Sequence, residues 1–426
     1  GGLPLLLRAF LNAQRAGIEE FVIVGEHPGG WLEHDKRIQA KWRWVPLDAS
    51  PNAPAALEAL RQAAANLPDQ FVLLFADSIF DAKALAELRA AGLDGKAARV
   101  AVSPGATGTI AAASLYLCRS DFVRFLEAEL AAGKSFDGIE SFAKHLRDRG
   151  RLGTVEVSGG LWPRTSNPTQ LRLIHRQLTR FNLKPSDGLF AKFNKLVVAE
   201  PLIRFFLRTR ATPNVVTGLG LAIAVGAGWA FAQGSYGWSL AGALLAYASA
   251  IMDHVDGMVA RLKFLESDFG VWFESVVDHA SYLFIFVGLS LGLYRETGFA
   301  HHLFVGALFL AGAIVGSIVT SRQRKLASAD NLTDYPNRIH AKLEQKSRNF
   351  FHWFTRRCYF LTRRAVLPYF ILLFCLLDLR VLLLGSVTFG ANLVWLLTLY
   401  NNRLFRSTST SRQIAAGGAD AKPLNL

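Results

Sequence analysis

The 426-residue sequence predicts an α/β, Rossmann-like soluble domain fused to an all-α bundle of six transmembrane helices. Three observations predict this fold class. Short apolar runs alternate with helical patterns up to about residue 183, which is typical of α/β domains. Long apolar stretches dominate residues 213–401, and each is near the ~20 residues that cross a bilayer. Basic residues cluster on alternate links between these stretches, as in multi-pass membrane proteins.

The first domain is expected to span residues 1–183. Its pattern predicts helices at 5–16, 53–65, 120–132 and 136–148, and strands at 21–24, 71–75, around Val100 and at 112–117. Continuous apolar strands separated by helices predict a mainly parallel sheet covered on both faces. Ligands of such sheets bind beyond the carboxyl ends of the strands, which is where Asp77 falls. Because the chain begins without Met inside a helical pattern, residues before Gly1 are expected to be missing.

A junction is expected at residues 184–212. The segment 184–188 has the sequence Lys-Pro-Ser-Asp-Gly, which is a turn composition. The basic, amphipathic pattern of residues 189–210 then predicts a helix that lies in the membrane interface.

The membrane domain is expected at residues 213–406, followed by a disordered tail at 407–426. Its apolar stretches predict helices at about 214–233, 238–257, 271–293, 302–320, 362–379 and 382–401. The links at 234–237, 294–301 and 380–381 carry few basic groups, whereas the opposite links are basic. The positive-inside rule therefore places the soluble domain and both termini in the cytoplasm, with the helices in the cell membrane.

The net charge of +14 at pH 7 admits nucleic acid as a partner, but its distribution favours a membrane surface. Residues 321–364 hold eleven Lys/Arg against three Asp/Glu, as expected for a face beside anionic lipid. The sequence has no aromatic-interleaved basic groove of the kind that binds nucleic acid, so we expect no nucleic-acid partner. The three cysteines, Cys118, Cys358 and Cys375, are far apart and predict buried thiols and no disulfide framework.

The residues that predict chemistry lie between the second and third membrane helices. Asp253 and Asp256 are three residues apart and so share one helix face, and Glu274 and Asp278, four apart, share a face of the next helix. A hairpin of the two helices would bring the four carboxylates together near the cytoplasmic membrane surface. Such a cluster repels itself and is costly to desolvate unless protons or cations neutralise it. Oxygen ligands suit Mg²⁺ or Mn²⁺, and two such ions would stabilise the charge that develops in phosphoryl transfer. Solvated acids at helix ends are the alternative that carries no function.

The run from Asp253 to Asp278 resembles the signature of the CDP-alcohol phosphotransferase family, DxxDGxxAR-x8-GxxxDxxxD. Thr-Pro-Asn at 212–214, before the first membrane helix, extends the resemblance. The resemblance implies that two metal ions are held by the four carboxylates and that Asp278 is also the general base for the acceptor hydroxyl. It further implies a CDP pocket formed by Asp256, Gly257, Ala260, Arg261 and Gly270. The family has Asp where this chain has Glu274, and we expect a working site with a slightly displaced metal.

The acceptor is expected to carry negative charge. Arg322 and Arg324 end the fourth membrane helix and are similar to an arginine pair that holds an acceptor phosphate in some family members; ordinary membrane anchoring explains them equally well. His254 and His279 adjoin motif acids, and we expect both to be packing or interfacial residues, because sequence neighbours on a helix face in different directions.

The N-terminal domain resembles a nucleotidyltransferase in which Asp77 matches a metal-binding Asp. The glycine-rich loop of that family is missing, and no carboxylate is found near residues 162–168. The domain is therefore expected to be incomplete and catalytically silent. The order of the two domains resembles the bifunctional inositol-1-phosphate cytidylyltransferase and di-myo-inositol phosphate phosphate synthase arrangement.

This resemblance implies transfer of a substituted phosphate from CDP-inositol, or a similar CDP-alcohol, to a phosphorylated polyol such as inositol phosphate, with release of CMP. Two alternatives stay open: a phospholipid synthase that uses CDP-diacylglycerol, and a membrane scaffold with decayed sites. Membrane lipid is an expected partner in each case, and a homodimer is compatible with the resemblance.

Overall fold

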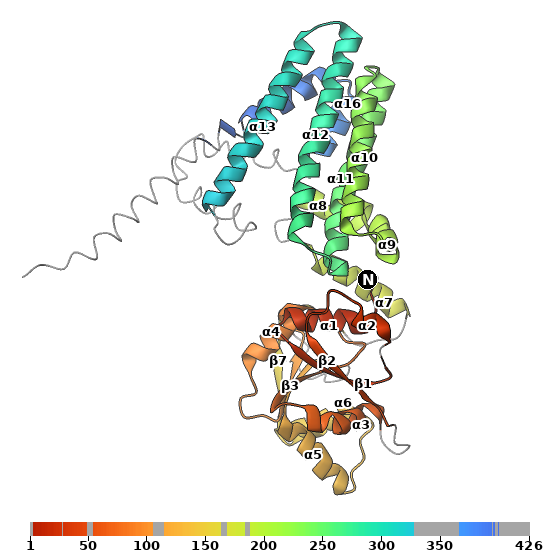
Figure 1. Cartoon of the computed structure of the whole chain (residues 1–426), viewed down its shortest axis with the longest axis vertical. Helices are drawn as coiled ribbons and strands as arrows, with labels where there is room; N and C mark the ends of the chain where they lie inside the picture. Colours follow the sequence, from red (N-terminus) through yellow and green to blue (C-terminus); the bar gives the residue numbers. More distant parts are fainter. Residues whose placement is uncertain are drawn as a thin grey trace, which may run out of the picture. The chain divides into compact units, whose positions relative to one another are not determined.

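The computed structural model describes residues 3–27, 29–48, 54–104, 115–162, 168–183, 188–327 and 366–393, together with 395, 396 and 399. Its contacts divide the chain into two compact units. The first comprises Gly1–Leu183 with the short segment Arg261–Phe264, and the second comprises Lys184–Ala260 with Leu265–Leu426. Figure 1 shows strands and helices in the first unit and helices in the second.

The first unit mixes strands and helices, as predicted. The α-helices are α1 (Leu5–Arg15), α2 (Gly30–Glu33), α3 (Ala55–Ala63), α4 (Ala82–Ala91), α5 (Ser120–Ala131), α6 (Ile139–Asp148) and α7 (Pro168–Phe181), with a 3-10 turn at Ala64–Asn66. The strands are β1 (Glu20–Gly25), β2 (Lys41–Pro46), β3 (Gln70–Leu74), β4 (Ile79–Phe80), β5 (Ala98–Val102), β6 (Leu115–Arg119), β7 (Leu152–Glu156) and β8 (Leu161–Trp162). The four predicted helices correspond to α1, α3, α5 and α6.

The prediction of a mainly parallel sheet is wrong. The largest described sheet has the order β3-β6-β5-β7, in which β6 runs antiparallel to both β3 and β5 and only β5–β7 is parallel. β1 and β2 form a parallel pair, and β4 and β8 form an antiparallel one. Apolar strand composition reports burial on both faces but not strand direction, which the connections decide.

The prediction that helices cover the sheet on both faces is confirmed. Tyr116 and Cys118 of β6 lie in a core with α3, α5 and α6, whereas Leu115 and Leu117 lie in a second core with α1 and α4. This alternation follows from the two-residue period of side chains along a strand. Cys118 and Cys375 are free and buried, as predicted, and Cys358 lies outside the described residues.

The predicted interfacial helix at 189–210 is interrupted. It consists of α8 (Leu189–Phe193), a π-helical turn (Asn194–Val198) and α9 (Glu200–Arg208). Pro201 lies in the first turn of α9, where it has no N–H to continue the ladder from the preceding turn. A proline is accepted at a helix start, so the sequence begins a new helix there.

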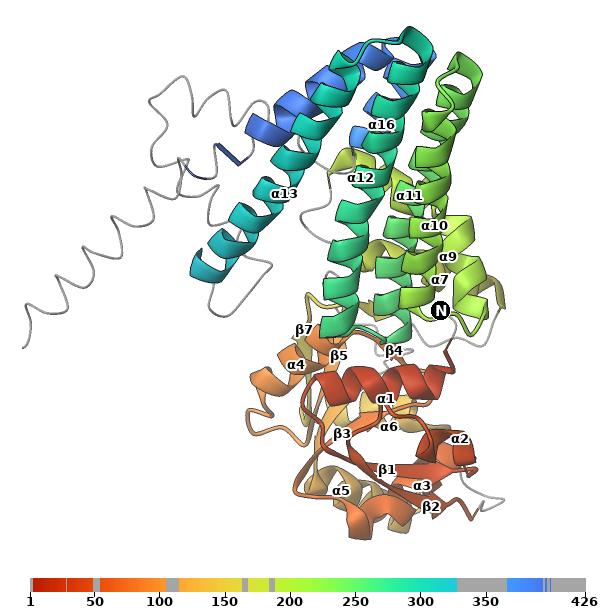
Figure 2. The ribbon, with the colours of Figure 1, turned by 45° about the horizontal axis from the view of Figure 1, so that its top comes forward.

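The second unit is helical. Its described helices after α9 are α10 (Pro213–Ala232), α11 (Tyr236–Lys263), α12 (Asp268–Thr297), α13 (His301–Ala327), α16 (Leu367–Leu376) and a further helix at Arg380–Leu393. Figure 2 shows α10, α11, α12 and α13 as long, roughly aligned rods. Among the described residues, three helical segments are long and apolar enough to span a membrane: Pro213–Ala232, Asp268–Thr297 and His301–Val319.

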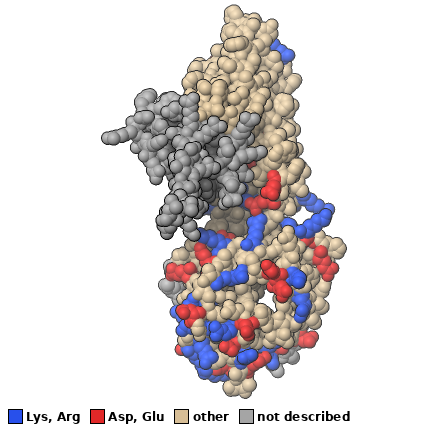
Figure 3. Space-filling view, turned by 60° about the vertical axis from the view of Figure 1, so that its left-hand side comes forward, with Lys and Arg blue, Asp and Glu red and all other residues tan. Residues whose placement is uncertain are grey.

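The expected number of six membrane helices stays a prediction, since three candidate spans are found among the described residues. α11 is long enough to span, but it is not among the three candidates, since polar residues and the motif acids interrupt its apolar sequence. The last two helices are short in the described part of the chain, at 367–376 and 380–393, and residues 351–365 lie outside it. On the face drawn in Figure 3, charged side chains gather over the first unit, while most of the coloured surface of the second unit consists of uncharged residues. This distribution agrees with helices that face lipid.

Glycines bring the backbones of α10 and α12 into contact. A methyl group added at Gly288 would lie 2.0 Å from the carbonyl oxygen of Gly228, and one at Gly292 would lie 2.0 Å from that of Phe231. Only glycine permits this approach, and small residues at helix contacts are typical of membrane bundles. The contact determines where α10 and α12 stand beside each other, and both helices contribute residues to the site described next.

Candidate active site

The motif acids lie on a helical hairpin formed by α11 and α12. α11 ends at Lys263. The next residue, Phe264, has a left-handed φ of 57°, and the Leu265 amide donates to the Ala260 carbonyl at 2.9 Å. This is the hydrogen bond of a Schellman cap. α12 then begins at Ser267, whose hydroxyl accepts from the Gly270 amide at 3.1 Å. A C-cap followed within three residues by an N-cap reverses the chain direction, so the acids on either side of the turn come together.

Three of the four predicted metal ligands form one compact group. Asp253, Asp256 and Glu274 each offer an oxygen, and these oxygens lie within 4.8 Å of one another. Asp256 is buried, whereas Asp253 and Glu274 are partly exposed. Three carboxylates at this spacing repel one another strongly, and the repulsion increases where water is excluded. The hairpin thus concentrates negative charge at one end of α11 and α12.

The two oxygens of Asp256 have different surroundings. Oδ2 accepts a hydrogen bond of 2.6 Å from the hydroxyl of Thr217 on α10. Oδ1 is buried and has no hydrogen-bond partner in the part of the chain that the structure describes. A buried carboxylate oxygen without a donor is costly unless a cation or another ligand satisfies it. Thr217 therefore holds one oxygen of the carboxylate and leaves the other available.

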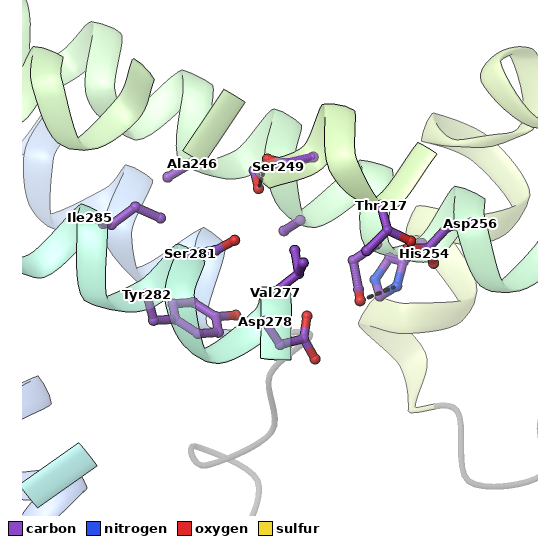
Figure 4. Close-up of a pocket in the computed structure, with 13 residues that line it drawn as sticks. Thr217, Ala246, Ser249, His254, Asp256, Val277, Asp278, Ser281, Tyr282 and Ile285 are labelled. Carbon is purple, nitrogen blue, oxygen red and sulfur yellow. Dashed lines mark hydrogen bonds and ion pairs between the residues drawn. The ribbon is translucent and has the colours of Figure 1, made fainter. Parts of the chain in front are cut away.

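Asp278 does not belong to the compact group, but it lines the same pocket as Asp253 and Asp256. The pocket lies between α10, α11 and α12, and Figure 4 shows the Asp278 carboxylate directed into it. A general base must reach the proton that it removes, and a ligand in this pocket would contact Asp278. The remaining lining is mostly small or hydroxyl-bearing, with one imidazole and two aliphatic side chains: Thr217, Gly220, Ala246, Ser249, Ala250, His254, Val277, Ser281, Tyr282 and Ile285.

The donor set fits a hard divalent cation. It consists of carboxylate oxygens alone, which Mg²⁺ and Mn²⁺ prefer. Oδ1 of Asp256 supplies an independent observation, because it is a buried acceptor with no donor among the described residues and a bound cation would satisfy it. Asp253, Asp256 and Glu274 are the residues that could hold such an ion. The number and the identity of the ions stay predictions.

The predicted CDP-binding residues lie along the same hairpin. Gly257 and Ala260 follow Asp256 on α11, and Gly270 lies in the first turn of α12. A methyl group added to Gly270 would lie 3.5 Å from the side-chain oxygen of Asn214, so this glycine is close to the start of α10. Arg261 belongs to the four-residue segment that groups with the first unit. Contact of these residues with a nucleotide stays a prediction.

The other predicted site residues lie elsewhere. Asp77 is partly buried in the turn that connects β3 to β4, just past the carboxyl end of β3. Arg322 and Arg324 lie on the last turns of α13, where the described structure does not extend to their side chains. Roles for these three residues stay predictions.

Among the pocket residues that the sequence did not predict, two lie against the motif acids. His254 was expected to face away from the motif acids, but it lines the pocket, and its Nδ1 lies 3.7 Å from Oδ2 of Asp253. The expectation was wrong because the long imidazole side chain can turn back toward the neighbouring residue. Thr217 carried no signal except its place one turn after the Thr-Pro-Asn at 212–214.

Comparison with known families identifies this helical region. Residues 210–376 match the family model described as CDP-alcohol phosphatidyltransferase. Residues 210–376 form a CDP-alcohol phosphatidyltransferase domain. The match includes Asp253, Asp256, Glu274 and Asp278, so the acidic group lies inside the domain that defines the family. The chain is accordingly a transferase.

Curated relatives extend the similarity beyond this domain. The chain is 26% identical to a Bifunctional IPC transferase and DIPP synthase of Rubrobacter xylanophilus over 348 residues, which cover 75% of this chain and 77% of the relative. A protein of the same name from Aquifex aeolicus is 26% identical over 179 residues, covering 42% and 40%. An Archaetidylinositol phosphate synthase of Methanothermobacter thermautotrophicus is 32% identical over 132 residues, covering 30% of this chain and 63% of the relative.

Proposed function

We propose that this chain is a divalent-metal-dependent membrane enzyme that transfers a substituted phosphate from a CDP-alcohol to an alcohol acceptor and releases CMP. The single observation that carries the proposal is the group of Asp253, Asp256 and Glu274 inside the CDP-alcohol phosphatidyltransferase domain. Mg²⁺ or Mn²⁺ held there would neutralise the carboxylates and the charge that develops on the diphosphate.

The proposed donor is CDP-inositol or a similar polar CDP-alcohol, and the proposed acceptor is a phosphorylated polyol such as inositol phosphate. The similarity to a Bifunctional IPC transferase and DIPP synthase supports this choice. A match over 75% of the chain extends past residues 210–376, so it includes part of the first unit. A similarity to the membrane domain alone would not distinguish this donor from a lipid donor.

We assign the site residues the following roles in the proposed transfer. Asp278 accepts the proton of the acceptor hydroxyl, and the oxygen forms a bond to the phosphorus that carries the donor alcohol. The bond between that phosphorus and the bridging oxygen of CMP breaks, and CMP leaves with the electron pair. Thr217 orients Asp256. Gly257, Ala260, Arg261 and Gly270 are proposed to contact the nucleotide, and Arg322 and Arg324 the acceptor phosphate.

The proposal places residues 213–406 in the cell membrane and residues 1–183, with both termini, in the cytoplasm. Residues 184–212 join the two domains along the membrane interface. We assign the first domain a nucleotidyltransferase-like origin with no activity of its own in this chain, and we include a homodimer in the proposal.

A phospholipid synthase that uses CDP-diacylglycerol is the second candidate. The observation that favours it is the 32% identity to an Archaetidylinositol phosphate synthase. The same carboxylates and the same pocket would serve either donor, so the donor has to be decided by assay.

The test is CMP release by the purified full chain with Mg²⁺ or Mn²⁺. CDP-inositol and CDP-diacylglycerol are each supplied with inositol 1-phosphate, glycerol 3-phosphate and inositol. We expect release from CDP-inositol with inositol 1-phosphate, and loss of release with EDTA. Release from CDP-diacylglycerol alone would establish the second candidate. No release with any pair, together with no Mn²⁺ binding, would refute the enzymatic proposal.

Glu274 provides a sharper test, since the family signature has Asp at this position. Glu274→Asp shortens the side chain by one methylene and is expected to sustain transfer, with a change in rate below about tenfold, because the carboxylate is retained. Glu274→Gln removes the charge and is expected to lower the rate by more than about 100-fold. Loss of transfer in Glu274→Asp would contradict the proposed accommodation of the longer side chain.

A further inference from the structure

We propose that Ser249 and Ser281 form a subsite for a second hydroxyl group of the acceptor, about one helical turn farther into the helical bundle than the carboxylates. The inference rests on the proposed function, since it takes the acceptor to be the molecule whose reacting hydroxyl meets Asp278. It adds a requirement on the polyol acceptor: a hydroxyl next to the reacting one contacts these two serines.

The pocket extends past the acidic group between the three helices. Along α12 it includes Asp278, Ser281, Tyr282 and Ile285, and at 1.5 Å per residue Ile285 is about 10 Å beyond Asp278. Along α11 it includes Ala246 and Ser249 as well as the motif acids. Because α11 and α12 form a hairpin, residues before Asp253 and residues after Asp278 lie in the same direction from the turn. Figure 4 shows Ser249 and Ser281 in this part of the pocket.

The hydroxyl of Ser281 is unusual for a serine on an apolar helix. Such hydroxyls ordinarily donate to a carbonyl of the preceding turn, as Ser317 does to Ala313 at 2.8 Å. Ser281 is nine-tenths buried, lines the pocket and has no such bond in the described part of the chain. Figure 4 shows its hydroxyl directed into the space between the helices. A hydroxyl that makes no bond within its own helix and faces the pocket is available for a ligand.

Ser249 supplies the complementary function. Its hydroxyl is buried and donates its proton to the Gly220 carbonyl at 2.8 Å. Its oxygen can therefore only accept a further hydrogen bond, whereas Ser281 can still donate one. A hydroxyl group of a ligand can donate a hydrogen bond to Ser249 and accept one from Ser281 at the same time. A phosphate oxygen only accepts, an ammonium only donates, and an acyl chain does neither.

The space has room for a group of the ligand. The cavity volume is about 50 Å³. A cavity needs about 10–15 Å³ to hold one water molecule, so this one can admit a hydroxyl group together with part of the molecule that carries it. Ser281 lies three residues after Asp278 and therefore on the same face of α12. An acceptor that presents one hydroxyl to Asp278 would place a neighbouring hydroxyl at Ser281.

The test compares Ser281→Ala with the matched control Ser317→Ala in the purified full chain. Loss of one hydrogen bond is expected to raise the KM for inositol 1-phosphate about fivefold, with the donor KM and the half-saturating Mg²⁺ concentration unchanged. Ser317→Ala removes a hydroxyl that bonds within its own helix and is expected to change none of these values. An unchanged acceptor KM in Ser281→Ala, or a raised donor KM instead, would overturn the subsite.

A binding measurement separates this inference from the proposed function. Calorimetry without donor compares inositol 1-phosphate with cyclohexyl phosphate, which has the same ring size and no free ring hydroxyls. The wild-type chain is expected to prefer the polyol, and Ser281→Ala to reduce that preference about fivefold. This result would support the subsite even if no CMP were released, in which case only the proposed function would fail. Equal binding of both probes by the wild-type chain would mean that the space holds water alone.

Discussion

The two units surround a buried carboxylate with opposite charges: basic side chains in the first unit and further carboxylates in the second. In the first unit, Glu129 exposes 7% of its surface, and its oxygens lie 2.6 Å from the Lys134 ammonium, 3.1 Å from His145 and 2.7 Å from Arg149. The hydrogen bond from Lys134, helped by the charges of Arg149, Lys134 and His145, holds the pKa of the Glu129 carboxyl below its ordinary value. The protein supplies the neutralising charge from its own side chains.

In the second unit, Asp256 exposes 3% of its surface, and its close charged neighbours in the described part of the chain include Asp253 and Glu274. One of its oxygens is held by Thr217, and the other has no hydrogen-bond donor among the residues that the structure describes. Burial alone therefore does not mark a functional acid. Glu129 belongs to a structural ion cluster because basic side chains compensate its charge. Asp256 is a candidate ligand because its close neighbours Asp253 and Glu274 add negative charge, which a bound cation or a proton would neutralise.

The most severe test of this contrast is Asp256→Asn. Loss of a metal ligand is expected to lower CMP release by at least about 100-fold. In the metal-free protein the same change is expected to leave the melting temperature equal or higher, because it removes like-charge repulsion. The rate is measured with saturating Mg²⁺ and the melting temperature in EDTA. Asp268→Asn, which changes an exposed acid on α12, is the control. A large loss of stability in metal-free Asp256→Asn would contradict the interpretation that the charge of Asp256 is uncompensated in the folded protein.

Thr217 gives a second test, because its hydroxyl orients the carboxylate of Asp256. Thr217→Val removes the hydrogen bond to Asp256 at nearly constant volume. We expect about 10- to 100-fold weaker activation by Mg²⁺, since residues that orient metal ligands have effects of this size. The maximal rate at saturating metal is expected to change less. Thr217→Ser retains the hydroxyl and is expected to restore metal activation; an equal defect in both variants would indicate a packing role only.

The units also differ in packing. Phenylalanine and leucine fill the core of the first unit, whereas glycine brings α10 and α12 together in the second. Gly288→Ala would place a methyl group 2.0 Å from the Gly228 carbonyl oxygen and is expected to destabilise the helical unit by about 1–3 kcal/mol. Thermal unfolding in detergent measures this. Gly385→Ala, where an added methyl group meets nothing within 4 Å, is expected to be neutral. Equal stability of the two variants would show that the α10–α12 contact is not tight.

The smallest expected effect belongs to Glu129. A carboxyl whose pKa is lower in the folded than in the unfolded state stabilises the fold above its unfolded pKa, and this stabilisation is lost as pH falls through the folded pKa. Glu129→Gln is therefore expected to lower the melting temperature at pH 7, and the difference from wild type is expected to shrink as the solution is acidified below pH 4. A difference that is independent of pH would show that the bases around Glu129 do not stabilise its charge.

The sequence predicted much of the fold and of the candidate site, and its failures have physical reasons. Apolar periodicity identified α1, α5, α6 and α10, because it reports which faces are buried. It did not identify the antiparallel direction of β6, since an apolar strand in either direction buries the same side chains. The helix at 189–210 was predicted as continuous because its amphipathic pattern continues through Pro201, whereas the backbone begins a new helix there.

The spacing of the motif acids, taken alone, determined that Asp253 and Asp256 share one face and that Glu274 and Asp278 share another, because the helical repeat is a local property. Only the tertiary structure decided that Glu274 joins the first pair while Asp278 lines the adjoining pocket, because that depends on the turn at Phe264 and on how α11 meets α12. The roles of Thr217 and Ser281 likewise needed coordinates. A hydroxyl's function depends on which atoms of other helices it meets, and short-range sequence does not specify these contacts.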